Sequence, residues 1–258
     1  LPGNSNKTEE YNGSGWASGG TLNTARAHIA ACGTQTAALG VAGLVHPAVQ
    51  DLVEQYDGSS WTEIADVNTA TRQHNASGTT TAAIKYSGHT GPPGGAVTGI
   101  TESWNGSSWT EVADQNTARF YAGGAGSSTS ALLWGGGPPA VSVSETWNGT
   151  SWTEGNNLNT ARAESTGAGE NAEAAMANTG VNASDARVTV TELYDGTSWT
   201  ETTDVPAARS GAAKSSCGTM SSAFLAGGFN PSDARQTTTF EFQKSILTYT
   251  PASWASAT

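Results

Sequence analysis

Short apolar runs alternate with clusters of glycine, serine, threonine and asparagine along the whole chain. Two clear runs are Ala131-Leu-Leu-Trp-Gly-Gly-Gly and Ala223-Phe-Leu-Ala-Gly-Gly, in which four apolar residues end at glycines. Apolar runs of this length, bounded by turn-forming residues, are typical of β-strands rather than of helices. The pattern therefore predicts an all-β protein built from many short strands.

The apolar runs belong to a repeat that occurs five times. Each copy contains Ser-Trp-Thr-Glu, a short linker and Asn-Thr-Ala-Arg, with small variations. The repeated tryptophans and arginines are Trp16, Trp61, Trp109, Trp152 and Trp199, and Arg26, Arg72, Arg119, Arg162 and Arg209. Successive arginines lie 43 to 47 residues apart. This period fits a four-stranded propeller blade and is too long for leucine-rich or ankyrin repeats.

Each copy can be divided into four strands. The first follows the arginine, the second is the apolar run that ends in glycines, the third ends in an aromatic residue, and the fourth begins at the tryptophan. Asn-Gly or Asp-Gly separates the third strand from the fourth and supplies the positive φ of a tight hairpin. These pairs are Asp57-Gly58, Asn105-Gly106, Asn148-Gly149 and Asp195-Gly196.

These strands predict a single domain, a five-bladed β-propeller of four-stranded antiparallel blades. We expect the blades at residues 26–71, 72–118, 119–161, 162–208 and 209–243, the last completed by residues 8–25, and a C-terminal tail at 244–258. In this arrangement the N-terminal strand, at residues 15–18, closes the ring and removes its exposed edges.

The third-strand position has one member more than the five tryptophans require. Its members are Tyr11, Tyr56, Trp104, Trp147, Tyr194 and Phe242. With five blades, one segment, at residues 8–12 or 237–243, is surplus, and we expect it to pair elsewhere, for instance with another subunit. Alternatively, residues 246–254 supply a local fourth strand.

The order of these motifs resembles the kelch repeat. The shared features are a glycine pair after an apolar strand, an aromatic strand, a tryptophan hairpin and an arginine before the next unit, and they cover residues 8–242. The glycine pair is reduced in three copies, to Ala42-Gly43, Ser87-Gly88 and Thr179-Gly180. The phrases Asn-Gly-Ser-Ser-Trp-Thr-Glu and Asn-Thr-Ala-Arg also resemble kelch-like repeat proteins of marine phages and bacteria.

The charge of the chain argues against two classes of partner, and the positions of its two cysteines argue against a disulfide. The formal net charge is −11, and the 11 lysines and arginines are scattered singly, so no basic stripe could neutralise nucleic-acid phosphates. The same negative charge disfavours direct contact with anionic lipid headgroups. Cys32 and Cys217 occupy the same Cys-Gly-Thr position in the first and last repeats, and we expect both to be reduced because equivalent places of adjacent blades are too far apart for a disulfide.

Residues that differ between copies are the candidate ligand-binding residues. The repeated tryptophans and arginines are expected to be structural, because one residue in the same place of every copy is typical of packing between blades. The second residue after each arginine varies and gives the candidates His28, His74, Tyr121 and Glu164. They would form a ring near the mouth of the central channel, either as an idle surface or as a ligand site.

No metal and no cofactor is predicted. Kelch-type copper oxidases use tyrosine and histidine ligands, but a five-fold arrangement spreads the candidate side chains around a ring instead of clustering them. The chain also lacks a nucleophile elbow, a zinc-protease motif and a P-loop.

We therefore expect a non-enzymatic structural or binding propeller, either extracellular or on a virion surface. Such a protein would be a phage tail or capsid appendage or a surface-filament module, and it would mediate assembly with other protein subunits or attachment to a host. The alternative is a lectin-like propeller that binds cell-surface glycan. A kelch-type oxidase or a glycosidase is a remote alternative.

Overall fold

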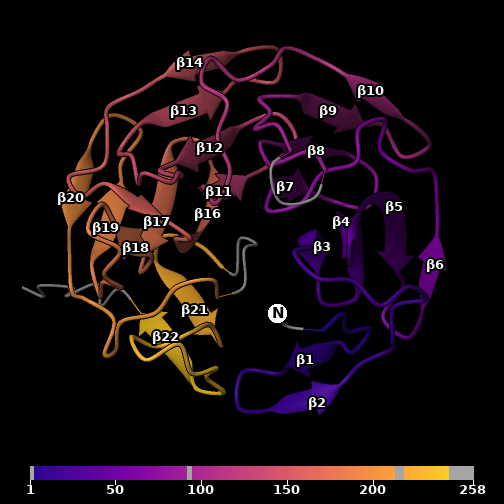
Figure 1. Ribbon diagram of the computed structural model, residues 1–258, viewed down its shortest axis with the longest axis horizontal. Coiled ribbons are helices and arrows are strands. Elements are labelled where there is room, and N and C mark those ends of the chain that lie inside the picture. Colours follow the sequence, from indigo (N-terminus) through magenta and orange to yellow (C-terminus); the bar gives the residue numbers. More distant parts are fainter. Residues whose placement is uncertain (1–2, 92–94, 213–217, 244–258) are drawn as a thin grey trace, which may run out of the picture.

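The computed structural model describes residues 3–91, 95–212 and 218–243, and within these ranges the chain forms strands and loops without a helix (Figure 1). The strands make antiparallel sheets that follow one another around a central axis, which is the arrangement of a β-propeller. The all-β prediction is confirmed.

Four sheets have four strands each and follow the chain order around the ring. The first two contain β3 (Ala30–Thr34), β4 (Ala37–Val45), β5 (Ala48–Tyr56) and β6 (Trp61–Glu63), then β7 (Asn75–Gly78), β8 (Ala83–Tyr86), β9 (Thr101–Trp104) and β10 (Trp109–Glu111). The next two contain β11 (Gly123–Gly126), β12 (Ala131–Trp134), β13 (Ser144–Trp147) and β14 (Trp152–Glu154), then β16 (Thr166–Asn171), β17 (Ala174–Asn178), β19 (Thr191–Tyr194) and β20 (Trp199–Glu201). A small two-stranded sheet, β15 (Arg162–Ala163) with β18 (Val181–Asn182), accompanies the fourth blade.

The prediction of five complete blades closed by the N-terminal strand is wrong. In the fifth repeat, β21 (Ser222–Ala226) pairs only with β22 (Thr239–Gln243), and β1 (Glu9–Tyr11) pairs only with β2 (Trp16–Ser18). No backbone pairing joins these two hairpins within the described residues. Instead of completing the fifth blade, β1–β2 lies between β21–β22 and the first blade (Figure 1).

The β1–β2 hairpin follows the course of the outer half of a blade. The Leu22 N–H donates to the Asn6 carbonyl at 2.8 Å, as the Leu158 N–H donates to Ser142 at 2.9 Å in the third blade. Its tryptophan also makes the contact expected between neighbouring blades. Trp16 Nε1 donates to Thr239 Oγ1 at 3.0 Å, as Trp152 Nε1 donates to Thr101 Oγ1 at 2.9 Å. The six third-strand segments therefore occupy six successive blade positions around the ring, which we call places. None of the six segments is surplus.

The hairpins between third and fourth strands have four-residue loops. In the first blade Tyr56 pairs with Trp61, and Asp57 Oδ1 accepts the backbone N–H groups of Ser59 and Ser60 at 2.9 and 2.8 Å. Gly58 has φ +94°, which explains the glycine after the aspartate. The turn position predicted from Asp-Gly and Asn-Gly is confirmed, although its loop is longer than a two-residue hairpin.

Hydrophobic cores lie between adjacent sheets. Trp109 packs in a cluster with Leu39 and Val53 of the preceding blade, and Trp152 packs in one with Ile84 and Tyr86. Trp199 likewise belongs to a cluster with residues of the third blade. These tryptophans are 5–6% exposed, whereas Trp16, in the incomplete part of the ring, is 41% exposed.

A buried glutamate on the third strand of each complete blade holds the linker that enters that blade. In the third blade, Glu145 Oε2 accepts the backbone and side-chain N–H groups of Asn116 at 2.8 and 2.9 Å, and Oε1 accepts Arg119 at 2.7 Å. The equivalent residues make the same contacts with their own Asn-Thr linkers; we call them the clamp glutamates, Glu54, Glu102, Glu145 and Glu192. Each clamp combines a buried ion pair with hydrogen bonds that satisfy the other carboxylate oxygen.

The second repeat builds its clamp with a different cation. Thr71, not Arg72, occupies the place of the repeated arginine, because the Thr71 carbonyl accepts the Gly43 N–H as the Arg119 carbonyl accepts the Gly88 N–H. Lys85 on β8 supplies the charge instead, with Nζ 3.0 Å from Glu102. The alignment of Arg72 with the other arginines is therefore wrong by one residue.

The fifth repeat has no clamp. Phe240 takes the position of the glutamate and Pro206 takes that of the asparagine. Arg209 lies with its guanidinium carbon 5.3 Å from the Phe240 ring centroid, a cation–π contact, and donates to Thr238 at 2.6 Å. Both ends of the clamp are thus replaced together.

Candidate functional site

Five residues connect successive places of the ring at one mouth of the central channel. The backbone N–H of each residue after the first donates to the carbonyl of the one before, which makes four hydrogen bonds of 2.7 to 3.4 Å. Each also has φ between +53° and +59°. We call this set the mouth ring; it consists of His28, Gln73, Tyr121, Glu164 and Gly211.

The mouth ring contains three of the four residues predicted as ligand-binding candidates. His28 is exposed, and Tyr121 and Glu164 are partly exposed. His74 lies outside the ring, because the arginine of its repeat is displaced by one residue and Gln73 takes its place. The His74 side chain is buried between blades, with Nε2 3.1 Å from the Val41 carbonyl oxygen.

Polar contacts run between neighbouring side chains of the mouth ring. Gln73 Nε2 donates to the Tyr121 hydroxyl. Burial raises the pKa of Tyr121, and the nearby Glu164 carboxylate adds to the rise. Tyr121 is therefore a neutral phenol, and this mouth presents hydrogen-bonding groups beside the Glu164 side chain. Among the residues that the structure describes, no group of three or more histidine, cysteine, aspartate or glutamate side chains could hold a metal ion.

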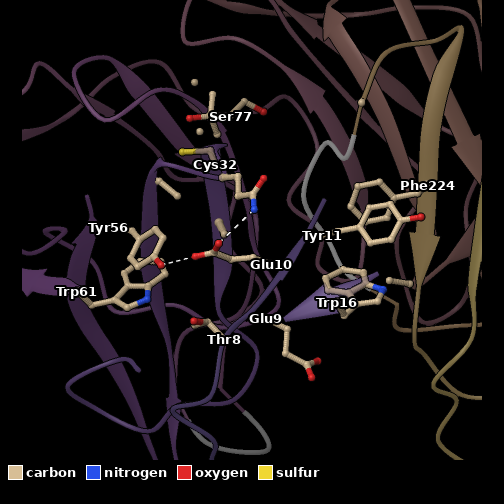
Figure 2. Close-up of a pocket in the computed structure, with 18 of the residues that line it drawn as sticks. Thr8, Glu9, Glu10, Tyr11, Trp16, Cys32, Tyr56, Trp61, Ser77 and Phe224 are labelled. Carbon is tan, nitrogen blue, oxygen red and sulfur yellow. Dashed lines mark hydrogen bonds between the residues drawn. The ribbon is translucent and has the colours of Figure 1, made fainter. Parts of the chain in front are cut away.

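A cavity of about 620 Å³ opens on the opposite side, where the inner strands of the sixth place would lie. It is lined by β1, β2, β3 and β21, and it reaches the glycines at the ends of the innermost strands, for example Gly33, Gly78 and Gly126. Because the innermost strands run from the mouth ring to these glycines, the cavity and the mouth ring lie at opposite ends of the channel. Figure 2 shows its side chains.

Aromatic and carboxylate groups line the two walls of the cavity. On one wall, Tyr11, Trp16 and Phe224 pack together with ring centroids 5.0 to 5.9 Å apart. On the other, Glu10 accepts hydrogen bonds from the Tyr56 hydroxyl and from Gln35 Nε2, and these bonds lower the pKa of Glu10. In Figure 2 the two groups lie on opposite sides of the cavity.

Glu9 is the fifth glutamate at the position of the clamp glutamates, which Phe240 occupies in the fifth repeat. Like Glu54, Glu145 and the others, it lies two residues before the aromatic that ends the third strand. Unlike them it is exposed, and its carboxylate makes no hydrogen bond or ion pair with any residue that the structure describes. None of the described residues forms at this place the linker that a clamp glutamate holds elsewhere in the ring.

Sequence reasoning missed the cavity, because it assigned β1–β2 to the fifth blade. The signal for a sixth place was present in the six-membered aromatic series, in Asn12-Gly13, which matches the other hairpin turns, and in Glu9.

No protein-family model matches the sequence, and no curated protein matches it. Within the described parts of the chain, no helix is long and apolar enough to cross a membrane.

Proposed function

We propose that this protein is a non-enzymatic propeller of kelch-like repeats that takes part in protein assembly, as a component of a virion surface or of an extracellular structure. The observation that carries the proposal is the half-built sixth place. There β1 has a strand neighbour on one side only within the described residues, beside a cavity of about 620 Å³.

An unpaired strand edge next to an apolar cavity favours a protein partner. Backbone N–H and C=O groups on such an edge pair with an added strand, and side chains that line the cavity supply specificity. The exposed Trp16 adds the kind of large aromatic surface that is enriched in protein interfaces. The net charge of −11 favours a protein or a glycan over nucleic acid or an anionic membrane.

The test is the location of the native protein. We expect quantitative mass spectrometry of its source to find the chain enriched in purified virions or surface filaments over the soluble fraction. Recovery only as a free soluble monomer would contradict the proposal.

Carbohydrate binding is the second candidate function, favoured by the aromatic wall of the cavity. Tyr11, Trp16 and Phe224 offer ring faces across the cavity from the Glu10 carboxylate, and sugars bind to aromatic faces bordered by hydrogen-bonding groups. We expect a bound oligosaccharide to change tryptophan fluorescence in the native protein and in Trp199→Phe, but not in Trp16→Ala. An unchanged signal across a panel of hexoses, hexosamines and sialic acids would exclude this function.

A further inference from the structure

The half-built sixth place can be compared with a complete place in the same ring. In the fourth blade, the linker at 159–162 and strands β16 and β17 fill the space inside β19 and β20. Glu192 accepts Asn159 at 2.7 and 2.8 Å and Arg162 at 2.6 Å. The sixth place has the outer hairpin and the glutamate, but the described residues supply neither linker nor inner strands.

The innermost strand of a complete blade consists mostly of small residues because it is tightly packed. A Cβ added to Gly124 would lie 2.6 Å from the Tyr86 hydroxyl oxygen, and one added to Gly123 would lie 2.3 Å from Trp134 Nε1. Both distances are too short for a side chain. Any segment that completes the sixth place in the same way must therefore carry glycine and alanine in its innermost strand.

The charge of the sixth place adds a second requirement. Glu9 has the position of a clamp glutamate but lacks the asparagine and arginine partners. The next residue, Glu10, already accepts hydrogen bonds from Tyr56 and Gln35. An arginine fork and an asparagine amide satisfy both oxygens of such a carboxylate at the complete places. A segment that begins with Asn-Thr-x-Arg would make the same contacts with Glu9.

We propose that the sixth place binds the first half of a repeat of this same kind, supplied by a second polypeptide. The incoming segment reads Asn-Thr-x-Arg followed by a glycine- and alanine-rich β-hairpin; its second strand pairs with the free edge of β1, and its arginine and asparagine bind Glu9. This inference deepens the proposed assembly function, on which it rests, by naming the partner segment.

A synthetic peptide with the sequence of residues 159–178 tests the proposal on the full chain. Labelled with a fluorophore, it should bind with a saturable change in anisotropy, and hydrogen exchange should show new protection at residues 8–11. Peptide variants Asn159→Ala and Arg162→Ala should each bind about tenfold more weakly or worse, because each loses a hydrogen bond to a charged group.

Matched protein variants locate the contact. Glu9→Gln should weaken binding by a similar factor, whereas Glu63→Gln, on an exposed glutamate of the first blade, should leave it unchanged. Absence of binding overturns the proposal, as does binding that is indifferent to both Glu9→Gln and Arg162→Ala, or protection that appears elsewhere. These results are separable from the proposed function, since assembly through another surface would keep the protein in particles while the peptide fails to bind.

Discussion

At the scale of single residues, the second repeat keeps a positive charge beside its buried glutamate but takes that charge from a different position in the sequence. Lys85 reaches Glu102 from β8, and Thr71 fills the place that an arginine has in the other repeats. In the fourth blade the counterpart of Lys85 is Ala177, and Arg162 supplies the charge. Two substitutions, Lys85→Ala and Thr71→Arg, should therefore convert the ion pair of the second blade into that of the fourth.

Lys85→Ala should destabilise the protein by about 3–5 kcal/mol, because it leaves the Glu102 carboxylate buried without its cation. Adding Thr71→Arg should recover most of that loss by restoring the arrangement of the fourth blade. Denaturant unfolding followed by tryptophan fluorescence measures both effects.

The exposed Lys7→Ala should leave the unfolding midpoint unchanged, which controls for the loss of a lysine as such. A double variant no more stable than Lys85→Ala alone would show that the two cations do not share a role.

Cys32 is a free buried thiol, and burial raises its pKa to about 12. At pH 8 its thiolate fraction is then roughly 10³-fold smaller than that of an ordinary cysteine. We expect a Cys217→Ser variant to react with a disulfide reagent only as fast as it unfolds. Rapid reaction of the folded variant, at the rate of a free thiol, would be inconsistent with this burial. The predicted reduced state of Cys217 concerns a residue outside the described parts of the chain.

At the scale of elements, the linkers are held by carboxylates rather than by strand pairing. In the third blade one glutamate, Glu145, accepts the backbone N–H groups of Asn116 and Thr117 and pairs with Arg119. The linker therefore depends on a side chain of the blade that it enters. Because the asparagine of the linker and the glutamate of the blade bind each other, the fifth repeat loses both together.

Glu145→Gln should loosen this linker, because the amide provides one acceptor oxygen and no charge for four donors. Hydrogen exchange at the amides of Asn116 and Thr117 should accelerate by tenfold or more, while β12 in the same blade keeps its protection. Glu170→Gln, on an exposed glutamate, is the matched control and should change neither. Unchanged exchange at both amides would mean that the carboxylate does not hold the linker.

At the scale of the whole molecule, the ring consists of four complete blades followed by two half-built places. In repeat architectures each unit is stabilised by its own sheet and by its neighbours. The hairpin β1–β2 has no inner strand partner within the described residues, and the inner neighbour of β21 is described only at the Gly218–Ala223 bridge. The two hairpins join each other through side chains such as Trp16 and Thr239. They should be the least stable part of the ring.

Native-state hydrogen exchange should rank the sheets accordingly. We expect the strand amides of β12 and β17 to exchange slowest, and those of β1 and β22 to exchange at least a hundredfold faster. Equal protection throughout would indicate that the ring unfolds as one cooperative unit.

The sequence predicted local features well and long-range pairing poorly. The strands and the Asp57 and Asn148 turns follow from residues close together in the chain, whereas joining residues 8–25 to the fifth blade required a guess about partners more than 200 residues apart. Aligning the second repeat on its arginine selected His74. Aligning it on Asn68-Thr69 would have selected Gln73. The backbone hydrogen bonds of this repeat are in register with its Asn-Thr linker and not with its arginine.

The mouth ring is joined by main-chain hydrogen bonds, which do not depend on the identity of its side chains. Its five positions could then diversify during evolution, or in a designed library, while the ring bonds remain intact. The positive φ determines which residue types these positions prefer. Glycine, asparagine, aspartate and histidine are favoured, and valine, isoleucine and threonine are disfavoured. We therefore expect related chains to differ at these five positions before they differ at the clamp glutamates.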